Sequence, residues 1–204
     1  MMDILFVRPA DDSAAIQVAA WGQAVRQMAG KFQIDDLAGA QSTRPAVDKR
    51  LASFRHLFWF GHGTETKLVA NGQALIDAGN IGNLGGGMVV AIACDAAVTL
   101  GQSAGQTSGF KAFLGFDDEL GFPTRAPLPM MLAVTNGLRC LFNQAHNIAC
   151  AADQLRKGFE AARIEYKQNG ANYGLSPAEI RTAWLFAKSN LHSIRTYGNS
   201  SMVL

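Results

Sequence analysis

Two residues, His62 and Cys94, have side chains that together support nucleophilic catalysis. His62 follows the apolar run "HLFWFG" and precedes Gly63, while Cys94 follows the apolar run "MVVAIA". A thiolate is the nucleophile in cysteine catalysis, and a nearby imidazole accepts the proton that the thiol loses. We expect the N–H groups of Gly63 and Cys94 to form an oxyanion hole, since glycine allows close approach to a substrate. The small residues after Cys94, "DAAVTLG", predict a helix whose N-terminus lowers the pKa of the thiol.

Each of these two residues follows a predicted strand. Short apolar runs that do not alternate with polar residues predict strands buried on both faces, at 3–7, 56–60, 88–93 and 111–116. The segment 32–39 is a candidate for one further edge strand. Neighbouring parallel strands lie about 5 Å apart, and their carboxyl ends share one edge of the sheet. We therefore expect His62 and Cys94 at the same edge.

Helical patterns separate and then follow these strands. The segment 12–30 begins with Asp12 or Ser13 as its cap, and 44–54 has Pro45 in its first turn. From about residue 126 the pattern is helical throughout, and "SPAE" is a clear helix start. The later helices are expected at 129–147, 150–168 and 176–195. The whole chain, 1–204, is thus predicted as one three-layer α/β/α domain with a mainly parallel central sheet and a helical C-terminal part.

Composition excludes several classes of protein. The net charge is only +2 and no cluster of Lys and Arg stands out, which argues against nucleic acid as a partner. The first apolar run, Ile4–Val7, is too short for a signal peptide or a membrane span. Three cysteines without a secretory context indicate reduced thiols. We therefore expect a cytoplasmic protein that has no membrane partner.

The segments "HLFWFGHG", "GMVVAIAC" and "GFKAFLGF" resemble the caspase-like (clan CD) cysteine peptidases, and among these the bacterial CHAT and gingipain-type branch. The resemblance covers about residues 40–120. It implies that His62 is the base and general acid, that Cys94 is the nucleophile and that Gly63 is an oxyanion donor. The sequence departs from many relatives after Cys94, where "DAA" stands in place of a Ser-Gly pattern.

The resemblance also implies partners. The substrate would be a protein or peptide, such as a pore-forming or other effector, in a bacterial antiviral defence or regulated cell death system. A regulatory partner would control activity, and Arg125 in "TRAP" would be a site of self-cleavage. No cofactor is implied, although some relatives require calcium.

Four carboxylates are candidates for the specificity pocket. Asp11 and Asp12 follow the first predicted strand, and Asp117 and Asp118 follow the last. Carboxylates in such a pocket select Arg or Lys in the substrate, which predicts cleavage after a basic residue. Two alternatives stay open: these residues act as a helix cap or turn, or Arg8 receives an acidic residue instead.

Three other kinds of site are less well supported by the sequence than the cysteine site. "GQSAG" matches a serine hydrolase motif, with Asp117 and His146 in suitable order, but residues 94–100 separate it from the strand. The glycine-rich segment 78–87 lacks the pattern of a nucleotide-binding loop. Cys140, His146 and Cys150 lack the spacing of a metal site, so no metal is predicted. The main alternative is a caspase-like binding or scaffold module in which Cys94 is catalytically silent.

Overall fold

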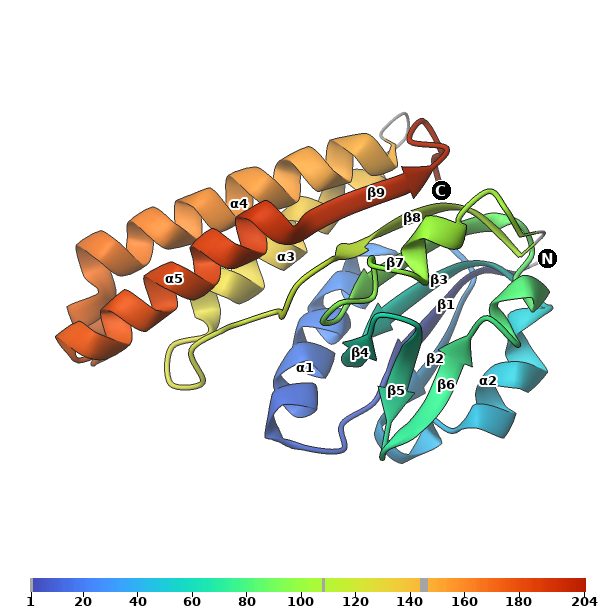
Figure 1. The fold of residues 1–204 in the computed structure, drawn as a ribbon, viewed down its shortest axis with the longest axis horizontal. Coiled ribbons are helices and arrows are strands. Elements are labelled where there is room, and N and C mark those ends of the chain that lie inside the picture. Colours follow the sequence, from blue (N-terminus) through green and yellow to red (C-terminus); the bar gives the residue numbers. More distant parts are fainter. Residues whose placement is uncertain (1, 108, 144–146) are drawn as a thin grey trace.

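A mostly parallel six-stranded sheet forms the centre of the molecule (Figure 1). The computed structural model describes residues 2–107, 109–143 and 147–204. Along the sheet the strand order is β2-β1-β3-β7-β8-β9, and only β9 runs antiparallel to its neighbour. The strands are β1 (Met2–Arg8), β2 (Ile34–Ala38), β3 (Phe54–Phe60), β7 (Gly87–Ile92), β8 (Phe110–Phe116) and β9 (Ile194–Gly198). The order reverses between β1 and β3, and a ligand is expected beyond the carboxyl ends of strands at such a reversal.

All five strands predicted from the sequence are present, including the edge strand β2. The prediction missed β9, because residues 194 and 195 were assigned to the last helix. This segment leaves the helix at Ser193 and pairs with β8, with Ile194 opposite Phe116. Pairing with an available sheet edge outweighs local helical preference here.

In the described residues, five α-helices lie between or after the strands. They are α1 (Ser13–Met28), α2 (Arg44–Leu51), α3 (Leu128–Arg139), α4 (Ile148–Asn169) and α5 (Pro177–Ser193). Asp12 caps α1 by accepting the Ala15 N–H, and the capping box that begins α5 is formed, as predicted. Helix α3 is shorter than the predicted 129–147, since residues 140–142 form a 3₁₀ turn and residues 144–146 lie outside the described part of the chain.

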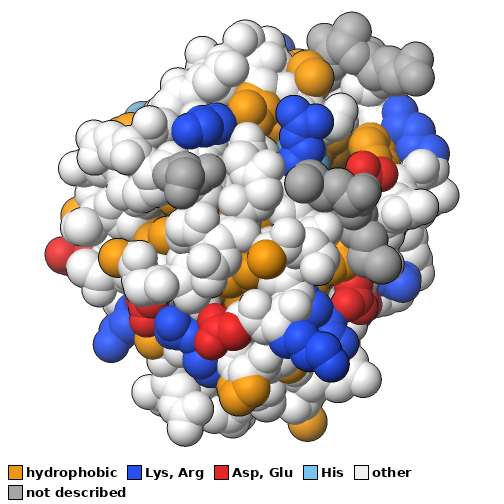
Figure 2. Space-filling model, turned by 90° about the vertical axis from the view of Figure 1, so that its right-hand side faces the viewer, with side chains coloured by type: hydrophobic (Ala, Val, Ile, Leu, Met, Phe, Trp, Pro, Cys, Tyr) orange, Lys and Arg blue, Asp and Glu red, His pale blue; other side chains and the backbone are white. Residues whose placement is uncertain are grey.

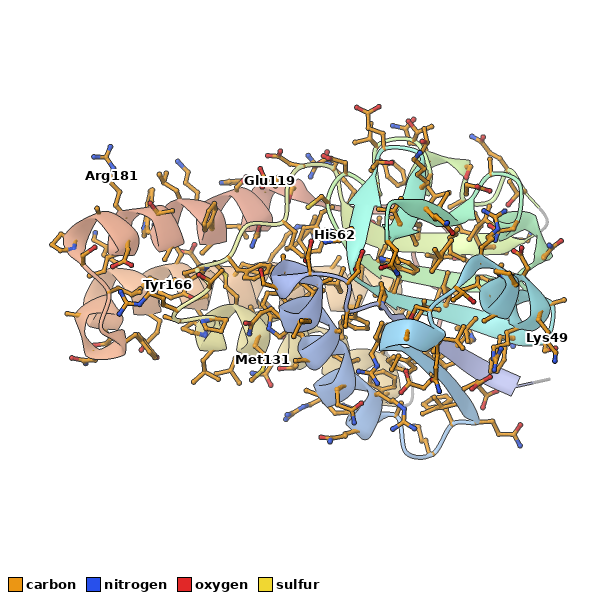
Figure 3. The ribbon with its side chains drawn as sticks, turned by 90° about the horizontal axis from the view of Figure 1, so that it is seen from below. Lys49, His62, Glu119, Met131, Tyr166 and Arg181 are labelled. Atoms are coloured by element: carbon orange, nitrogen blue, oxygen red, sulfur yellow. The ribbon has the colours of Figure 1, made fainter. Side chains whose placement is uncertain are left out.

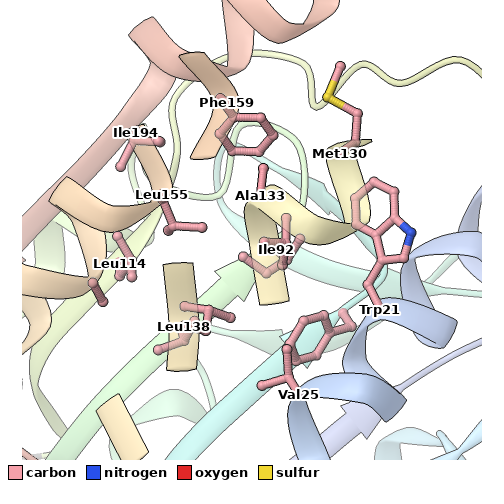
Figure 4. Packing of buried hydrophobic residues seen from close by; sticks show 14 of the residues in the cluster. Trp21, Val25, Ile92, Leu114, Met130, Ala133, Leu138, Leu155, Phe159 and Ile194 are labelled. Carbon is pink, nitrogen blue, oxygen red and sulfur yellow. The ribbon is translucent and has the colours of Figure 1, made fainter. Parts of the chain in front are cut away.

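Helices cover both faces of the sheet, so the molecule is a three-layer α/β/α domain. On one face, α1, α3 and α4 pack against alternate residues of the strands such as Phe58 and Ile92 (Figure 4). On the other face, residues of opposite orientation such as Leu57 and Trp59 pack under α2 and a small antiparallel sheet. The small sheet consists of β4 (His62–Thr64), β5 (Lys67–Ala70) and β6 (Gln73–Asp77), and it was not predicted.

The C-terminal helices extend past the sheet. In Figure 1, α3, α4 and α5 run together beyond the carboxyl ends of the parallel strands, away from the N-terminus. We call α4, α5 and the turn between them (residues 148–193) the helical arm. In the part of the chain that the structure describes, no helix is both long and apolar enough to cross a membrane.

Candidate active site

His62 lies just beyond the end of β3, and its backbone is held on both sides. The Gly61 N–H donates to the carbonyl oxygen of Ile92 in β7 over 3.3 Å. The indole Nε1 of Trp59 donates to the carbonyl oxygen of His62 over 3.0 Å. His62 then begins β4 and pairs with Val69. The buried strand therefore fixes the position of His62 at the sheet edge, as the sequence predicted.

The His62 side chain is paired with Asp12, the cap residue of α1. Nε2 of His62 lies 2.8 Å from Oδ2 of Asp12, while Oδ1 of Asp12 accepts the Ala15 N–H over 2.8 Å. The Ala15 N–H contributes most to lowering the pKa of Asp12, and the hydrogen bond and charge of His62 lower it further against the opposing effect of desolvation. When Nε2 carries its proton and donates it to this carboxylate, Nδ1 keeps its lone pair and is the basic nitrogen.

Cys94 follows β7 and is partly buried. Its Sγ accepts a hydrogen bond from the Leu120 N–H at 3.3 Å. Burial raises the pKa of the thiol most, the Leu120 N–H opposes this, and the charges of Asp95 and Glu119 raise it further. At neutral pH the free thiol is therefore protonated, so its reaction as a nucleophile requires a base.

The helix predicted after Cys94 is absent, and that prediction was wrong. Residues 96–100 form turns, followed by a 3₁₀ turn at Gly101–Ser103. Asp95 has a positive φ of 53°, an unusual conformation for a residue other than glycine. The next turn is anchored to the sheet, where the Ala97 N–H donates to the carbonyl oxygen of Phe116. No helix N-terminus is available here to lower the pKa of Cys94.

Gly63 connects the two predicted catalytic residues. A Cβ atom at this position would collide with the carbonyl oxygen of Cys94 and would lie 2.9 Å from Cβ of Ala93. The backbone that carries His62 therefore packs directly on the backbone of Cys94. Glycine is needed here for contact within the chain, in addition to any approach to a substrate.

Each of the four predicted pocket carboxylates has a partner within this chain. Asp12 contacts His62, and Asp11 Oδ2 accepts the Asn71 N–H over 2.6 Å. Asp117 Oδ2 lies 2.6 Å from Nε of Arg195, and Asp118 Oδ2 accepts the Ser189 hydroxyl over 3.1 Å. The pairing with His62 was not predicted.

Asp95 lies among other carboxylates near Cys94, whereas Arg8 is paired elsewhere. Burial raises the pKa of Asp95 most, followed by the charges of Asp118, Glu65, Glu119 and Asp117. Because Asp117 is paired with Arg195, the other carboxylates supply most of the negative potential close to Cys94. Arg8 is buried and donates twice to the carboxylate of Asp36, so its guanidinium does not face a substrate.

Helix α5 holds the loop that contacts the Cys94 thiol. The buried Asn190 accepts the Gly121 N–H over 3.1 Å and donates to the Gly121 carbonyl over 2.8 Å. The Asp117 N–H also donates to the carbonyl oxygen of Ser193. His62 and Glu119 lie where the arm meets the sheet (Figure 3). We call the two hydrogen bonds between Asn190 and the Gly121 backbone the Asn190 clamp. It was not predicted from the sequence, although a polar residue inside an apolar helix pattern, such as Asn190, was a usable signal.

The competing sites receive little support from the geometry. Ser103 lies in the 3₁₀ turn, and its hydroxyl donates to the Leu100 carbonyl. Of its two predicted partners, Asp117 is paired with Arg195, and His146 lies outside the described residues. Burial and the neighbouring thiol of Cys150 raise the pKa of Cys140 to about 12. In the described ranges, no group of three or more His, Cys, Asp or Glu side chains is arranged to hold a metal ion.

Comparison of the chain with protein-family models, curated proteins and solved structures gives no match.

Proposed function

We propose that this protein is a cysteine endopeptidase of the caspase-like (clan CD) type, with Cys94 as nucleophile and His62 as base. One observation carries the proposal: the Asp12–His62 hydrogen bond lies on a backbone segment that packs, through Gly63, against Cys94. Such a site needs a nucleophile, a base and a third group that orients the base. Cys94, His62 and Asp12 would fill these three roles. His62 and Cys94 follow neighbouring strands at the carboxyl edge of the sheet, where an α/β sheet is expected to bind its ligand.

The reaction proceeds by acyl transfer. His62 accepts the Sγ proton of Cys94, and the thiolate attacks the carbonyl carbon to form a C–S bond. The N–H groups of Gly63 and Cys94 stabilise the oxyanion. The imidazolium then protonates the leaving amine as the C–N bond breaks, and a water activated by His62 hydrolyses the thioester. Because the pKa of Cys94 is raised, proton transfer to His62 is an essential step of attack.

The substrate would be cleaved after a basic residue. Asp118, Glu65 and Glu119 raise the pKa of Asp95 by their charge, and the negative potential they create beside the nucleophile favours Arg or Lys. The wider implications of the resemblance belong to this proposal: a cytoplasmic bacterial enzyme, a protein substrate in antiviral defence, and self-cleavage at Arg125. The side chain of Arg125 is 68% exposed and contacts Glu179 at 3.3 Å, whereas Ala126 on the other side of the bond is buried, so cleavage there requires this segment to leave its place in the fold.

A positional-scanning library of fluorogenic peptides tests this proposal. Cleavage after Arg or Lys is expected, and it should disappear in Cys94→Ala and His62→Ala but persist in Cys150→Ala. Turnover that survives in Cys94→Ala, or no turnover above the inactive variants, would contradict the peptidase assignment. A preference for Asp before the cleaved bond would contradict the argument from negative potential.

The raised pKa of Cys94 favours a second candidate, a scaffold module in which the thiol is silent. Alkylation by iodoacetamide distinguishes the two. An active site requires Cys94 to react faster than Cys150, another partly buried cysteine, and to slow down in His62→Ala. Equal rates in the wild type and in His62→Ala would favour the scaffold.

A further inference from the structure

A basic and aromatic patch lies on the helical arm, away from the candidate active site. Its centre is Trp184 of α5. Trp184 lines two neighbouring surface pockets, and four cations line them with it, two from each helix of the arm. With Trp184 they define the Trp184 patch: Arg163 and Lys167 of α4, and Arg181 and Lys188 of α5. The two helices are antiparallel neighbours, so residues distant in sequence form one surface (Figure 1).

Cations occupy the neighbourhood of the Trp184 ring. The guanidinium carbon of Arg163 lies 5.3 Å from the ring centroid, and Nζ of Lys188 lies 5.5 Å from it. These are cation–π distances. Because the ring is already engaged by two side chains, it is a poor platform for stacking a nucleic acid base, which needs a free face.

A small apolar pocket opens beside the ring. It has a volume of about 280 Å³ and is lined by Lys167, Pro177, Ile180, Arg181 and Trp184. Its walls are the apolar parts of these side chains, and two of its five lining residues carry positive charge. Such a pocket accepts one large apolar side chain while its rim attracts carboxylates.

The charge of the patch differs from that of the rest of the molecule. Among its neighbours Glu160 is paired with Arg163 at 2.6 Å, which leaves Lys167, Arg181 and Lys188 without an ion pair among the described residues. The whole chain has a net charge of only +2. At the opposite end of the molecule, Lys, Arg, Asp and Glu side chains are interspersed (Figure 2).

We infer that the Trp184 patch binds an acidic peptide segment of a partner protein, with one apolar side chain in the pocket and flanking carboxylates on Lys167, Arg181 and Lys188. The positive charge of the patch favours an acidic partner. The apolar pocket favours a peptide with an apolar side chain over a ligand that offers only phosphate groups. The inference is independent of the chemistry of Cys94.

Tryptophan fluorescence gives a direct test. Trp21 and Trp59 are fully buried, so Trp184 is the tryptophan most sensitive to a surface ligand. The probes are three capped hexapeptides: EELFEE, EESSEE without the apolar side chains, and KKLFKK with reversed charge. EELFEE should change the fluorescence of the wild type at micromolar to millimolar concentrations and bind at least about tenfold more tightly than the other two.

Charge reversal locates the binding site. The double variant Arg181→Glu/Lys188→Glu should weaken EELFEE binding, measured by calorimetry, by about tenfold or more. Lys49→Glu, at the opposite end of the molecule, is the matched control and should bind as the wild type does (Figure 3). Absence of EELFEE binding, equal weakening in both variants, or tighter binding of a six-nucleotide DNA strand or of anionic vesicles would overturn the inference. Unchanged thermal midpoints of both variants show that the fold is retained.

Discussion

Asp12 and His62 are fifty residues apart in sequence, and their side chains meet at 2.8 Å at the carboxyl edge of the sheet. Asp12 terminates the loop after β1, whereas His62 follows β3, the neighbouring strand. The two oxygens of Asp12 have different tasks, since one caps α1 and the other contacts the imidazole. One carboxylate thus couples the start of a helix to the orientation of the candidate base.

The variant Asp12→Asn separates the capping of α1 from the contact with His62. Asparagine remains a good helix cap but removes the negative charge opposite His62, so peptidase kcat should fall by about tenfold or more while the thermal midpoint changes little. Asp12→Ala should in addition lose about 1 kcal/mol of stability, measured by urea unfolding. Asp11→Asn is the control, because the Asp11 carboxylate accepts the Asn71 N–H and forms no hydrogen bond with His62 in the described residues. Equal kcat in Asp12→Asn and wild type would show that the carboxylate does not orient His62.

Gly63→Ala tests the close contact between the backbone segments that carry His62 and Cys94. The added methyl group would collide with the Cys94 carbonyl, which belongs to the backbone and cannot rotate away. We expect a loss of about 1–3 kcal/mol in the free energy of unfolding. In Gly82→Ala the new Cβ meets nothing within 4 Å, so this variant should differ from the wild type by less than about 1 kcal/mol. Similar stability in the two variants would contradict the packing described for Gly63.

Asn190→Ala tests the clamp between α5 and the loop at Cys94. The variant leaves the buried N–H and C=O of Gly121 without their side-chain partner, at a cost of about 2–4 kcal/mol in urea unfolding. Leu120 directly precedes Gly121 in the same loop, and its N–H donates to Sγ of Cys94. The alkylation rate of Cys94 should therefore also change. Leu185→Ala on the exposed side of α5 is the control, since its side chain is 48% exposed. A Cys94 rate that is the same in Asn190→Ala, Leu185→Ala and wild type would show that the clamp does not reach the thiol.

The sequence was a good guide to the central sheet because each strand is buried on both faces and therefore reads as a continuous apolar run. It was a poorer guide to β5 and β6, which cover the sheet with only one buried side. Their turn was nevertheless marked: Asn71 and Gly72 both have positive φ, and Asn-Gly between apolar residues is a strong hairpin signal.

The same contrast holds for the candidate site. The strand ends placed His62 and Cys94 at one edge, since that follows from local pattern and parallel topology. The partner of His62 and the clamp from Asn190 depend on contacts between distant segments, which a local pattern does not contain. The helix predicted after Cys94 does not form for a similar reason. Asp95 adopts a positive φ, and the Ala97 N–H donates to Phe116 in the sheet, a contact between distant segments that the local pattern does not contain.

His56 makes stability depend on pH independently of the candidate site. Its side chain is 2% exposed, its Nδ1 accepts the Met88 N–H, and burial together with the charge of Arg55 lowers its pKa from 6.5 to about 4. Between these two values the unfolded chain binds a proton that the folded chain excludes, so the stability present above pH 6.5 is lost as the pH falls towards 4. The difference corresponds to roughly 3 kcal/mol.

Urea unfolding of wild type and His56→Asn at pH 7 and pH 4.5 measures this effect. Asparagine keeps an acceptor for the Met88 N–H but does not titrate, so the variant should lose clearly less stability on acidification than the wild type. An NMR titration of the His56 ring in the intact protein should show a neutral imidazole down to about pH 4. Parallel acid destabilisation of both proteins, or protonation of the His56 ring near pH 6.5, would show that the buried imidazole is not the cause.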